Sequence, residues 1–292
     1  MDKLLFYAQS LVLGVVEEGC TEFLPVSSTG HLIVFEALLG FQGRARYVET
    51  YSYVIQLGAV LAVAVLYRRQ IGASLQAFWP RGGLQPRPWA ETGLYFWLSL
   101  ALACLPGLLA TLLLGSLADA FFSQPGWVAL ALILGGAALC LAERFWARPA
   151  AARPALPWPQ VSMRQALTVG AFQCLAVLPG VSRSASTIIG GWFAGLDTTA
   201  SAAFSFFLAM PVMAGMSALK LIQLGGFAAM DPVELTGLGI GFAVSFLTAL
   251  LVVKRFTAYV AKQGMVLFGV YRTVFGFLIL AALASGGLAP AA

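Results

Sequence analysis

Long apolar segments separated by short polar loops make up most of the chain. The apolar segments lie near 4–39, 51–67, 93–117, 126–142, 165–196, 200–224, 233–253 and 265–285. A helix of about 20 predominantly apolar residues is long enough to cross the hydrocarbon core of a bilayer. The stretches Leu98–Leu114 and Phe242–Val253 contain no charged residue. The pattern predicts an all-α polytopic membrane protein, because helices satisfy their own backbone polar groups in lipid.

Composition supports this prediction. Of the 292 residues 60% are hydrophobic and 10% are charged, against roughly a quarter charged in soluble domains, and the mean hydropathy is +0.87. A soluble protein of this size cannot hide so much apolar surface in one core. The composition therefore excludes a soluble globular enzyme, a disordered chain and a nucleic-acid-binding protein. The four cysteines lie in apolar stretches without metal-ligand spacing.

The connecting loops differ in charge, and this difference predicts their side of the membrane. Basic residues collect in three loops, at 68–92, 143–164 and 254–264. The loops at 118–125 and 225–232 each carry one aspartate and no basic residue. The positive-inside rule places the three basic loops in the cytoplasm and the other two outside.

Counting the crossings predicts a re-entrant hairpin. The chain leaves the cytoplasm near residue 164 and is outside by residue 225, so it crosses an odd number of times between them. Two apolar segments lie there, and one of them, 165–196, is interrupted by Pro179-Gly180 and then by Arg183. Such a break suits a re-entrant hairpin that lines a cavity better than a lipid-facing helix. The first segment, 4–39, is interrupted in the same way at Pro25.

The two interruptions form an internal repeat. A shift of 155 residues pairs Glu18 with Gln173, Val26 with Val181, Ser27 with Ser182 and Ser28 with Arg183. One hairpin opens outward and the other inward, so the repeats are predicted to be inverted. The halves of the single domain 1–292 are about 1–142 and 160–285, joined by the cytoplasmic loop 143–164. An inverted repeat places both breaks near the bilayer midplane, where two half-helix N-termini can face one ligand.

Two carboxylates precede the first break. Glu18 and Glu22 are four residues apart, so a helix would stack them on one face. Like charges on one face of an apolar helix are costly unless a cation, a proton or an arginine lies between them. Pro25 is expected to end this helix, because proline lacks an amide hydrogen and clashes with the preceding turn.

Hydroxyl side chains and the single histidine follow the break. Ser27, Ser28 or Thr29 can cap the next helix, and a helix N-terminus with free amides is a natural phosphate site. His31 follows one turn later and can exchange a proton near neutral pH. In membrane helices such hydroxyls usually make hydrogen bonds between helices, but their combination with ionisable residues indicates a functional site.

The second break offers a complementary set of side chains. Arg183 supplies a planar guanidinium that matches two phosphate oxygens. Hydroxyl groups surround it where a new helix can begin, on Ser182, Ser184, Ser186 and Thr187.

These two motifs resemble those of a known family. Glu18–His31 resembles the glutamate-rich first motif of the bacterial undecaprenyl-diphosphate phosphatases of the bacitracin-resistance type, and Pro179–Thr187 matches their second motif, PGxSRSxxT, at every defined position. The resemblance implies six transmembrane helices plus two re-entrant helix hairpins in an inverted repeat. It also implies an inner-membrane enzyme, often dimeric, that uses Mg²⁺ or Ca²⁺. Such an enzyme removes the terminal phosphate of undecaprenyl diphosphate at the periplasmic side, which recycles the lipid carrier for cell-wall synthesis and confers bacitracin resistance.

The resemblance carries roles over to individual residues. Glu18 and Glu22 become the acidic pair, which we expect to hold the cation. The expected catalytic residues are His31, Glu22, Glu18, Ser28 and Arg183. The expected phosphate contacts are Ser27, Ser28, Thr29, Ser182, Arg183, Ser184 and Thr187. The chain departs from the family pattern in one place, since it has Glu17-Glu18 where the family usually has a single acidic or amide residue.

Two other functions fit parts of the pattern. A lipid or anion transporter would use the carboxylates as proton carriers and Arg183 as an anion site, since inverted repeats with midplane half-helices are common in transporters. A phosphatase of the phosphatidic-acid type has a Ser-Gly-His motif that Ser28-Thr29-Gly30-His31 resembles faintly, but its chemistry needs a second histidine that this chain lacks. The sequence leaves open whether water attacks the phosphate directly or a phospho-enzyme forms, with His31 or Ser28 as the nucleophile.

Overall fold

The structure is a computed structural model that describes residues 3–39, 45–79, 89–122, 124–148 and 158–286. Within these ranges the side chains of residues 17, 18, 29, 33, 36–39, 45, 46 and 119 lie outside the description, and these include Glu17, Glu18 and Thr29. The described part of the chain is helical and contains no strand, as the apolar pattern predicts.

The two halves of the chain have a similar order of elements. The first half contains α1 (Lys3–Leu13), η1 (Gly14–Cys20), α2 (Ser28–Leu39), α3 (Ala45–Leu66), α4 (Arg68–Gln76), η2 (Trp89–Glu91), α5 (Gly93–Phe122) and α6 (Pro125–Trp146). The second half contains α7 (Met163–Gln173), η3 (Cys174–Val177), α8 (Arg183–Phe193), α9 (Thr198–Leu224), η4 (Phe227–Ala229), α10 (Pro232–Gln263) and α11 (Val266–Ala284). Each half begins with two short helices separated by a break and continues with three long helices.

Six helices are long and apolar enough to cross a membrane. Their apolar parts are Tyr47–Leu66, Gly93–Ala118, Pro125–Trp146, Thr198–Leu224, Pro232–Gln263 and Val266–Ala284. Each coincides with one of the apolar segments that the sequence shows without a polar break. The number and the length of these apolar helices therefore confirm the prediction of a polytopic membrane protein.

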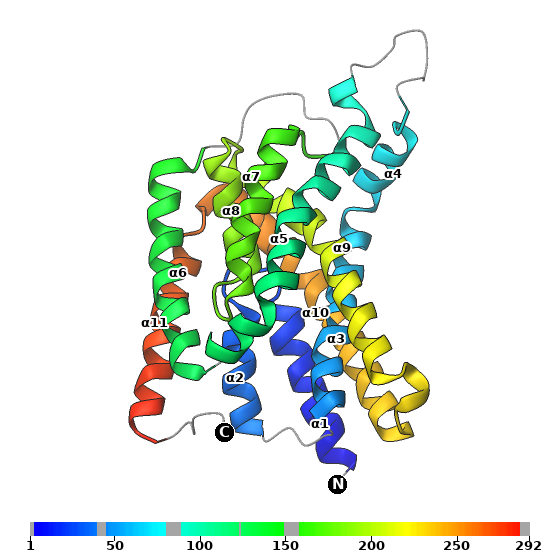
Figure 1. Ribbon diagram of the computed structural model, residues 1–292, viewed down its shortest axis with the longest axis vertical. Helices are drawn as coiled ribbons and strands as arrows, with labels where there is room; N and C mark the ends of the chain where they lie inside the picture. The colour runs from blue at the N-terminus through cyan, green and yellow to red at the C-terminus, as the bar shows by residue number, and fades with distance from the viewer. Residues whose placement is uncertain (1–2, 40–44, 80–88, 123, 149–157, 287–292) are drawn as a thin grey trace.

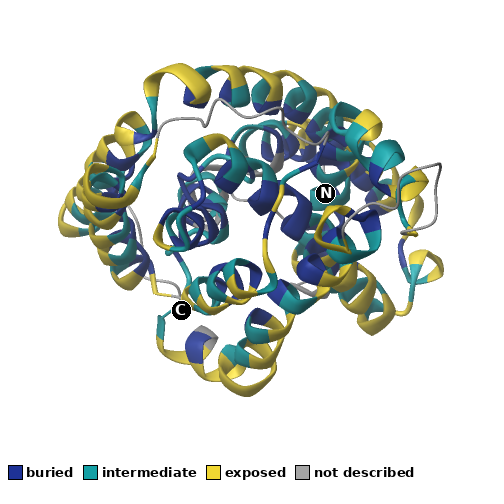
Figure 2. Cartoon of the chain, turned by 90° about the horizontal axis from the view of Figure 1, so that it is seen from above, coloured by how far each residue is buried: buried dark blue, intermediate teal, exposed yellow. Residues whose placement is uncertain are grey.

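The outer surface of the helix bundle is apolar. On α5 the side chains of Leu112 and Leu113 are 70% and 76% exposed, and on α9 that of Ile222 is 74% exposed. Viewed from above, the exposed positions form a ring around the outside and the buried positions lie within it (Figure 2). In water, the exposure of so large an apolar surface would be unfavourable, whereas in a bilayer the lipid tails solvate it.

The two short-helix pairs enter the molecule from opposite ends. Figure 1 shows α1 and α2 in the lower half and α7 and α8 in the upper half, with the two breaks meeting near mid-height. Helix α4, the end of α6, the start of α7 and the turn between α10 and α11 all lie at the upper end (Figure 1). The described parts of the three basic loops thus lie at one end of the molecule.

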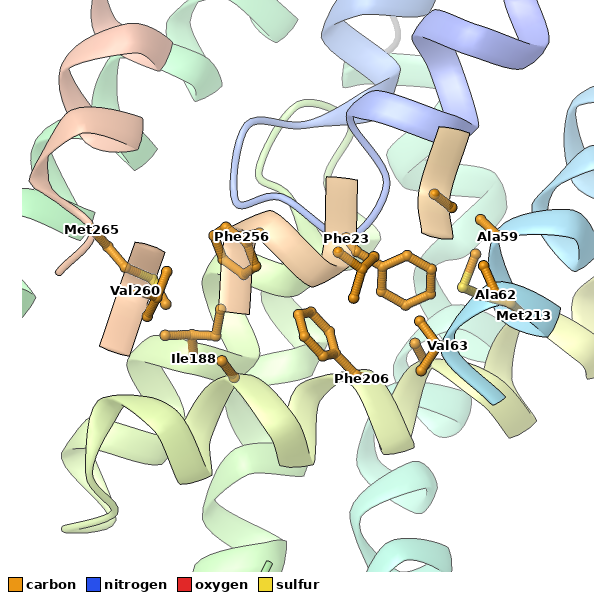
Figure 3. Close-up of a cluster of buried hydrophobic side chains, with 14 of the residues drawn as sticks. Phe23, Ala59, Ala62, Val63, Ile188, Phe206, Met213, Phe256, Val260 and Met265 are labelled. Carbon is orange, nitrogen blue, oxygen red and sulfur yellow. The ribbon is translucent and has the colours of Figure 1, made fainter. Parts of the chain in front are cut away.

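A cluster of buried apolar side chains fixes the first break to the second half. Phe23, which lies in the break itself, packs edge-on against Phe206 of α9 with ring centroids 5.4 Å apart. Phe206 in turn contacts Phe256 of α10 at 5.9 Å. Figure 3 shows these rings side by side in the cluster. Aromatic pairs of this kind add about 0.5–1.5 kcal/mol each beyond the area they bury.

Glycines let helices of the two halves meet backbone to backbone. A Cβ atom at Gly14 would lie 2.7 Å from the carbonyl oxygen of Gly241 in α10, and one at Gly136 would lie 2.5 Å from that of Gly269 in α11. Small residues at such crossings are typical of packed membrane helices. Any larger residue at Gly14 or Gly136 would push the two helices apart.

Candidate active site

The two breaks share one unusual backbone conformation. Ser27 has a φ of 70° and Ser182 a φ of 71°, and within the described ranges they are the positive-φ residues other than glycine. They are 155 residues apart, which is the offset that the repeat predicts. A strained backbone of this kind costs of order 1–3 kcal/mol and is found mostly at functional sites.

In the first break, Ser27 caps the helix that follows. Helix α2 begins at Ser28, and Ser27 Oγ accepts a hydrogen bond from the amide of Gly30 at 3.5 Å. The carbonyl oxygen of Ser27 accepts from Nδ1 of His31 at 2.8 Å. Of the three hydroxyl residues predicted as possible caps, Ser27 is therefore the one that caps α2.

The second break repeats this arrangement at the same offset. Helix α8 begins at Arg183, and Ser182 Oγ accepts from the amide of Ala185 at 3.3 Å. Ser186 Oγ donates to the carbonyl oxygen of Ser182 at 3.0 Å, as His31 does to that of Ser27. The two breaks therefore share individual contacts at the offset of 155 residues that the sequence suggests.

The helix before the first break ends earlier than the sequence predicts. Element η1 is a π-helix that ends at Cys20, and Thr21 donates its hydroxyl to the carbonyl five residues earlier at 3.1 Å. Glu22 therefore lies beyond the helix, so the prediction that Glu18 and Glu22 stack on one helical face is wrong. Pro25 does not end the helix either. Single-turn π-helices occur frequently at functional sites.

An ion pair joins the two breaks. Arg183 Nη2 donates to Oε1 of Glu22 at 3.1 Å, and the two side chains are only 14% and 9% exposed. Ser28 Oγ donates to the other carboxylate oxygen, Oε2, at 2.8 Å. The structure thus brings together three of the predicted catalytic residues, and the charge of Glu22 is neutralised by Arg183.

Arg183 also keeps one donor nitrogen free. Its Nη1 is buried and has no hydrogen-bond partner among the described residues. The guanidinium carbon lies 5.8 Å from the ring centroid of Phe23, and Nη2 is 3.6 Å from Sδ of Met213. Leaving a buried charged donor unpaired costs at least about 1–3 kcal/mol. An anionic oxygen beside Nη1 would remove this cost.

The remaining hydroxyls of the second motif hold the site together. Ser184 Oγ donates to the carbonyl oxygen of Leu24 in the first break at 2.8 Å, and Ser182 Oγ lies 3.2 Å from Ser184 Oγ. Thr187 is fully buried, and its Oγ1 lies 2.7 Å from Oγ of Ser205 on α9. Ser184 therefore links the breaks, whereas Thr187 packs α8 against α9.

His31 is held by residues that the motifs do not include. It is 4% exposed, its Nε2 lies 2.7 Å from Oη of Tyr271, and its ring stacks on Phe275 at 4.4 Å. In the described part of the chain no hydrogen bond or ion pair joins His31 to Glu22 or Arg183. The predicted histidine thus lies on α2, and its ring nitrogens bond to Ser27 and Tyr271 rather than to the ion pair.

Arg272 supports the second break from α11. Its side chain is fully buried, and Nη2 donates to the carbonyl oxygens of Gly180 at 3.2 Å and Val181 at 2.9 Å. Neither motif points to Arg272 or to the neighbouring Tyr271. In the sequence, the signal for Arg272 is an arginine inside an otherwise apolar helix, whereas a tyrosine in such a helix gives no comparable signal.

A cation site is only partly within the described residues. Among these residues no three His, Cys, Asp or Glu side chains cluster in a way that could hold a metal ion. Glu22 and Ser28 provide carboxylate and hydroxyl oxygens, which are the ligands that Mg²⁺ and Ca²⁺ take. The side chain of Glu18, the second predicted ligand, lies outside the described residues, as does that of Thr29, a predicted phosphate contact.

Comparison with known proteins agrees with the motifs. The family model described as bacitracin resistance protein BacA matches residues 10–278. The undecaprenyl-diphosphatase of Ruminiclostridium cellulolyticum is 45% identical over 284 residues, which cover 97% of this chain and 98% of that protein. The enzyme of the same name from Clostridium tetani is 38% identical, with 95% and 96% covered. Undecaprenyl-diphosphatase 2 of Clostridium acetobutylicum is 36% identical, again with 95% and 96% covered. This multi-pass membrane protein belongs to the BacA family of bacitracin resistance proteins.

Proposed function

We propose that the chain is an undecaprenyl-diphosphatase, which hydrolyses undecaprenyl diphosphate to undecaprenyl phosphate and inorganic phosphate. Relatives that match nearly the whole chain carry this name. The observation that carries the proposal is the position of Arg183. One of its nitrogens pairs with Glu22, and another is buried without a partner at the point where α8 begins.

The terminal phosphate would bind between the two breaks. Helices α2 and α8 both begin there, and the N-terminus of a helix presents free amides and the positive end of its dipole to an anion. Nη1 of Arg183 supplies a charged donor in a site with little water, where such a donor stabilises developing negative charge most strongly. The prenyl chain would lie along the apolar outer surface of the bundle.

Ser28 is the nucleophile that the geometry favours. Its hydroxyl already donates to Glu22, and a hydroxyl paired with a base is the usual form of an activated nucleophile. Ser28 Oγ would attack the terminal phosphorus, its proton would pass to Glu22, and undecaprenyl phosphate would leave as the bridging bond breaks. Water would then hydrolyse the phosphoserine. His31, three residues after Ser28, lies on the same side of α2 and would take the proton of this water.

Glu22 and Glu18 would hold the divalent cation. When bound, Mg²⁺ or Ca²⁺ neutralises charge on the diphosphate. Glu22 supplies carboxylate oxygens and Ser28 a hydroxyl oxygen beside it, and such a cation prefers oxygen ligands.

The two short-helix pairs would be re-entrant hairpins. Helices α2 and α8 have 12 and 11 residues, which corresponds to about 17 Å of helix, whereas α1 continues directly into η1 and α7 into η3. The hydrocarbon core is about 30 Å thick, so α2 and α8 would each reach only about half-way. The pairs would open toward opposite sides, in an inverted repeat.

The basic end of the molecule would face the cytoplasm, so the first hairpin would open to the periplasm. Thiol labelling tests this orientation in a chain whose natural cysteines are replaced by alanine. In intact spheroplasts, a membrane-impermeant reagent is expected to label Ala228→Cys, in the loop between α9 and α10, and to spare Arg255→Cys at the basic end. The reverse pattern would overturn the orientation.

Phosphate release by purified protein in detergent tests the activity. Wild-type protein is expected to release phosphate from C55 diphosphate, and Arg183→Ala to lose activity by about 100-fold or more, as when an oxyanion donor is removed. Arg255→Ala, which changes an exposed arginine, serves as the matched control. A transporter would release no phosphate from a lipid diphosphate in detergent, so inactive wild-type protein would favour that alternative.

An acid-quench experiment tests the nucleophile. Substrate labelled with ³²P in the terminal phosphate is expected to leave label on wild-type protein and none on Ser28→Ala. Label retained by a folded Ser28→Ala variant would assign the attack to another group.

A further inference from the structure

Tyr271 of α11 covers the single histidine of the chain. Its hydroxyl oxygen lies 2.7 Å from Nε2 of His31, and its ring lies parallel to the imidazole, with the centroids 5.7 Å apart and the planes 5° apart. Phe275, one turn later on the same helix, stacks on His31 at 4.4 Å. Two aromatic rings from α11 thus fix the plane of the imidazole.

The hydrogen bonds also define the protonation state of His31. The carbonyl oxygen of Ser27 can only accept, so Nδ1, at 2.8 Å, carries the hydrogen. In a neutral imidazole Nε2 then has only a lone pair, and the hydroxyl of Tyr271 must donate to it. Nε2 is therefore the nitrogen that can take up a proton, and it is reached through Tyr271.

Exposure differs sharply between the two side chains. His31 is 4% exposed, whereas Tyr271 is 43% exposed. The tyrosine hydroxyl thus occupies the position beside Nε2 through which the buried imidazole can exchange a proton. A proton that moves to Nε2 without displacing Tyr271 has to pass through its oxygen.

We propose that Tyr271 is a positioning residue for the phosphatase reaction and acts through His31. It keeps the Nε2 lone pair in place and relays one proton, giving its own hydrogen to Nε2 while its oxygen accepts a hydrogen from the attacking water. The tyrosine is neutral before and after, and His31 ends as the imidazolium. This inference rests on the proposed phosphatase function.

Two substitutions separate the hydroxyl from the ring. Tyr271→Phe keeps the stacking and removes the oxygen, whereas Tyr271→Leu removes both. If the hydroxyl acts through His31, both variants lose kcat by about 10-fold or more, which is within the range of proton-transfer catalysis, while KM changes much less. If the ring alone matters, Tyr271→Phe keeps the wild-type kcat and the proposal fails. Tyr259→Phe removes a hydroxyl from α10 whose ring packs on Phe268, and is expected to keep full activity.

The single histidine permits a second readout that does not depend on activity. Protein labelled with ¹⁵N-histidine gives the ring signals of His31 alone. We expect one protonated nitrogen, Nδ1, and one unprotonated nitrogen whose resonance moves in Tyr271→Phe but not in Tyr259→Phe. An unmoved resonance would overturn the contact and with it the proposal. Wild-type protein without phosphatase activity would overturn the proposed function instead, whatever this spectrum shows.

Discussion

Ser27 and Ser182 adopt the same positive φ, at 70° and 71°, in two segments that share little sequence. Each serine accepts a hydrogen bond from the amide three residues later and offers its carbonyl oxygen to the side chain four residues later. The chain thus uses one turn twice, at the start of α2 and at the start of α8. The turn aims both helix N-termini at the ion pair between Glu22 and Arg183.

Substitutions at Ser182 test whether this turn is strained. Ser182→Ala keeps the Cβ atom that makes a positive φ unfavourable and loses the cap, so we expect the free energy of unfolding to fall by about 1 kcal/mol. Ser182→Gly relieves the strain and costs only a few tenths of a kcal/mol as a cap, so it is expected to be the more stable variant. Unfolding in detergent micelles measures the difference. At Ser162, which caps α7 with a φ of −70°, glycine relieves no strain and the gap between the variants is expected to be smaller.

The ion pair between Glu22 and Arg183 is expected to show strong coupling. Glu22→Met or Arg183→Met alone leaves a nearly buried charge without its partner, which costs about 3 kcal/mol. The double variant removes both charges and is expected to recover most of this loss, because apolar replacements of buried ion pairs are often neutral. A double-mutant cycle on the free energy of unfolding measures the coupling. Additive effects would show that the two charges do not stabilise each other.

Arg272 is expected to hold the second break in place. Arg272→Met removes the donor to the carbonyl oxygens of Gly180 and Val181, and hydrogen bonds from charged groups contribute about 1.5–3 kcal/mol. Hydrogen exchange measured by mass spectrometry is expected to speed up over residues 180–187 and to stay unchanged over 28–31. Arg164→Met, at an exposed position on α7, is the matched control. Equal exchange in both breaks would argue against a local role.

Removal of divalent cations is expected to stop the reaction. With Glu22 and Glu18 as ligands, a chelator should abolish phosphate release, and Mg²⁺ or Ca²⁺ should restore it. The same cations should raise the Tm of wild-type protein, since a ligand that binds only the folded state stabilises it by about 2.7 kcal/mol at 100 times its Kd. Glu22→Gln should lose this Tm shift. Full activity in excess chelator would rule out the cation.

Much of the architecture was predictable because lipid imposes simple rules. The length of an apolar run identifies a spanning helix, and the basic residues of the loops mark one end of the molecule, so the six long helices follow from the sequence. The repeat was also predictable, since the pairing of Ser27 with Ser182 depends only on their spacing. Glu22, Ser28 and Arg183, which the structure brings together, stand out in the sequence because polar groups are costly in an apolar segment.

Other features depend on contacts that the sequence does not display. The π-helix η1 ends at Cys20, and Thr21 donates to the carbonyl oxygen of Val16. Periodicity alone cannot distinguish this from an α-helix that continues to Glu22. The partner of Nε2 of His31 comes from α11, 240 residues later in the chain. In the sequence, a tyrosine in an apolar helix is indistinguishable from an ordinary packing residue. Only the fold shows that Tyr271 lies beside a histidine.

The glycine contacts described above bear on how the molecule can move. Gly14 meets Gly241, and Gly136 meets Gly269, and each contact joins the first half of the chain to the second. Transporters with inverted repeats commonly work by rocking one body against another around a fixed site. Here the helices of the two repeats pack between one another, so neither repeat is a separate body. A rocking motion would have to separate these glycine contacts, and because they join backbone to backbone, no rotation of a side chain can loosen them. We therefore expect the site to remain stationary within the membrane while the lipid substrate diffuses to it.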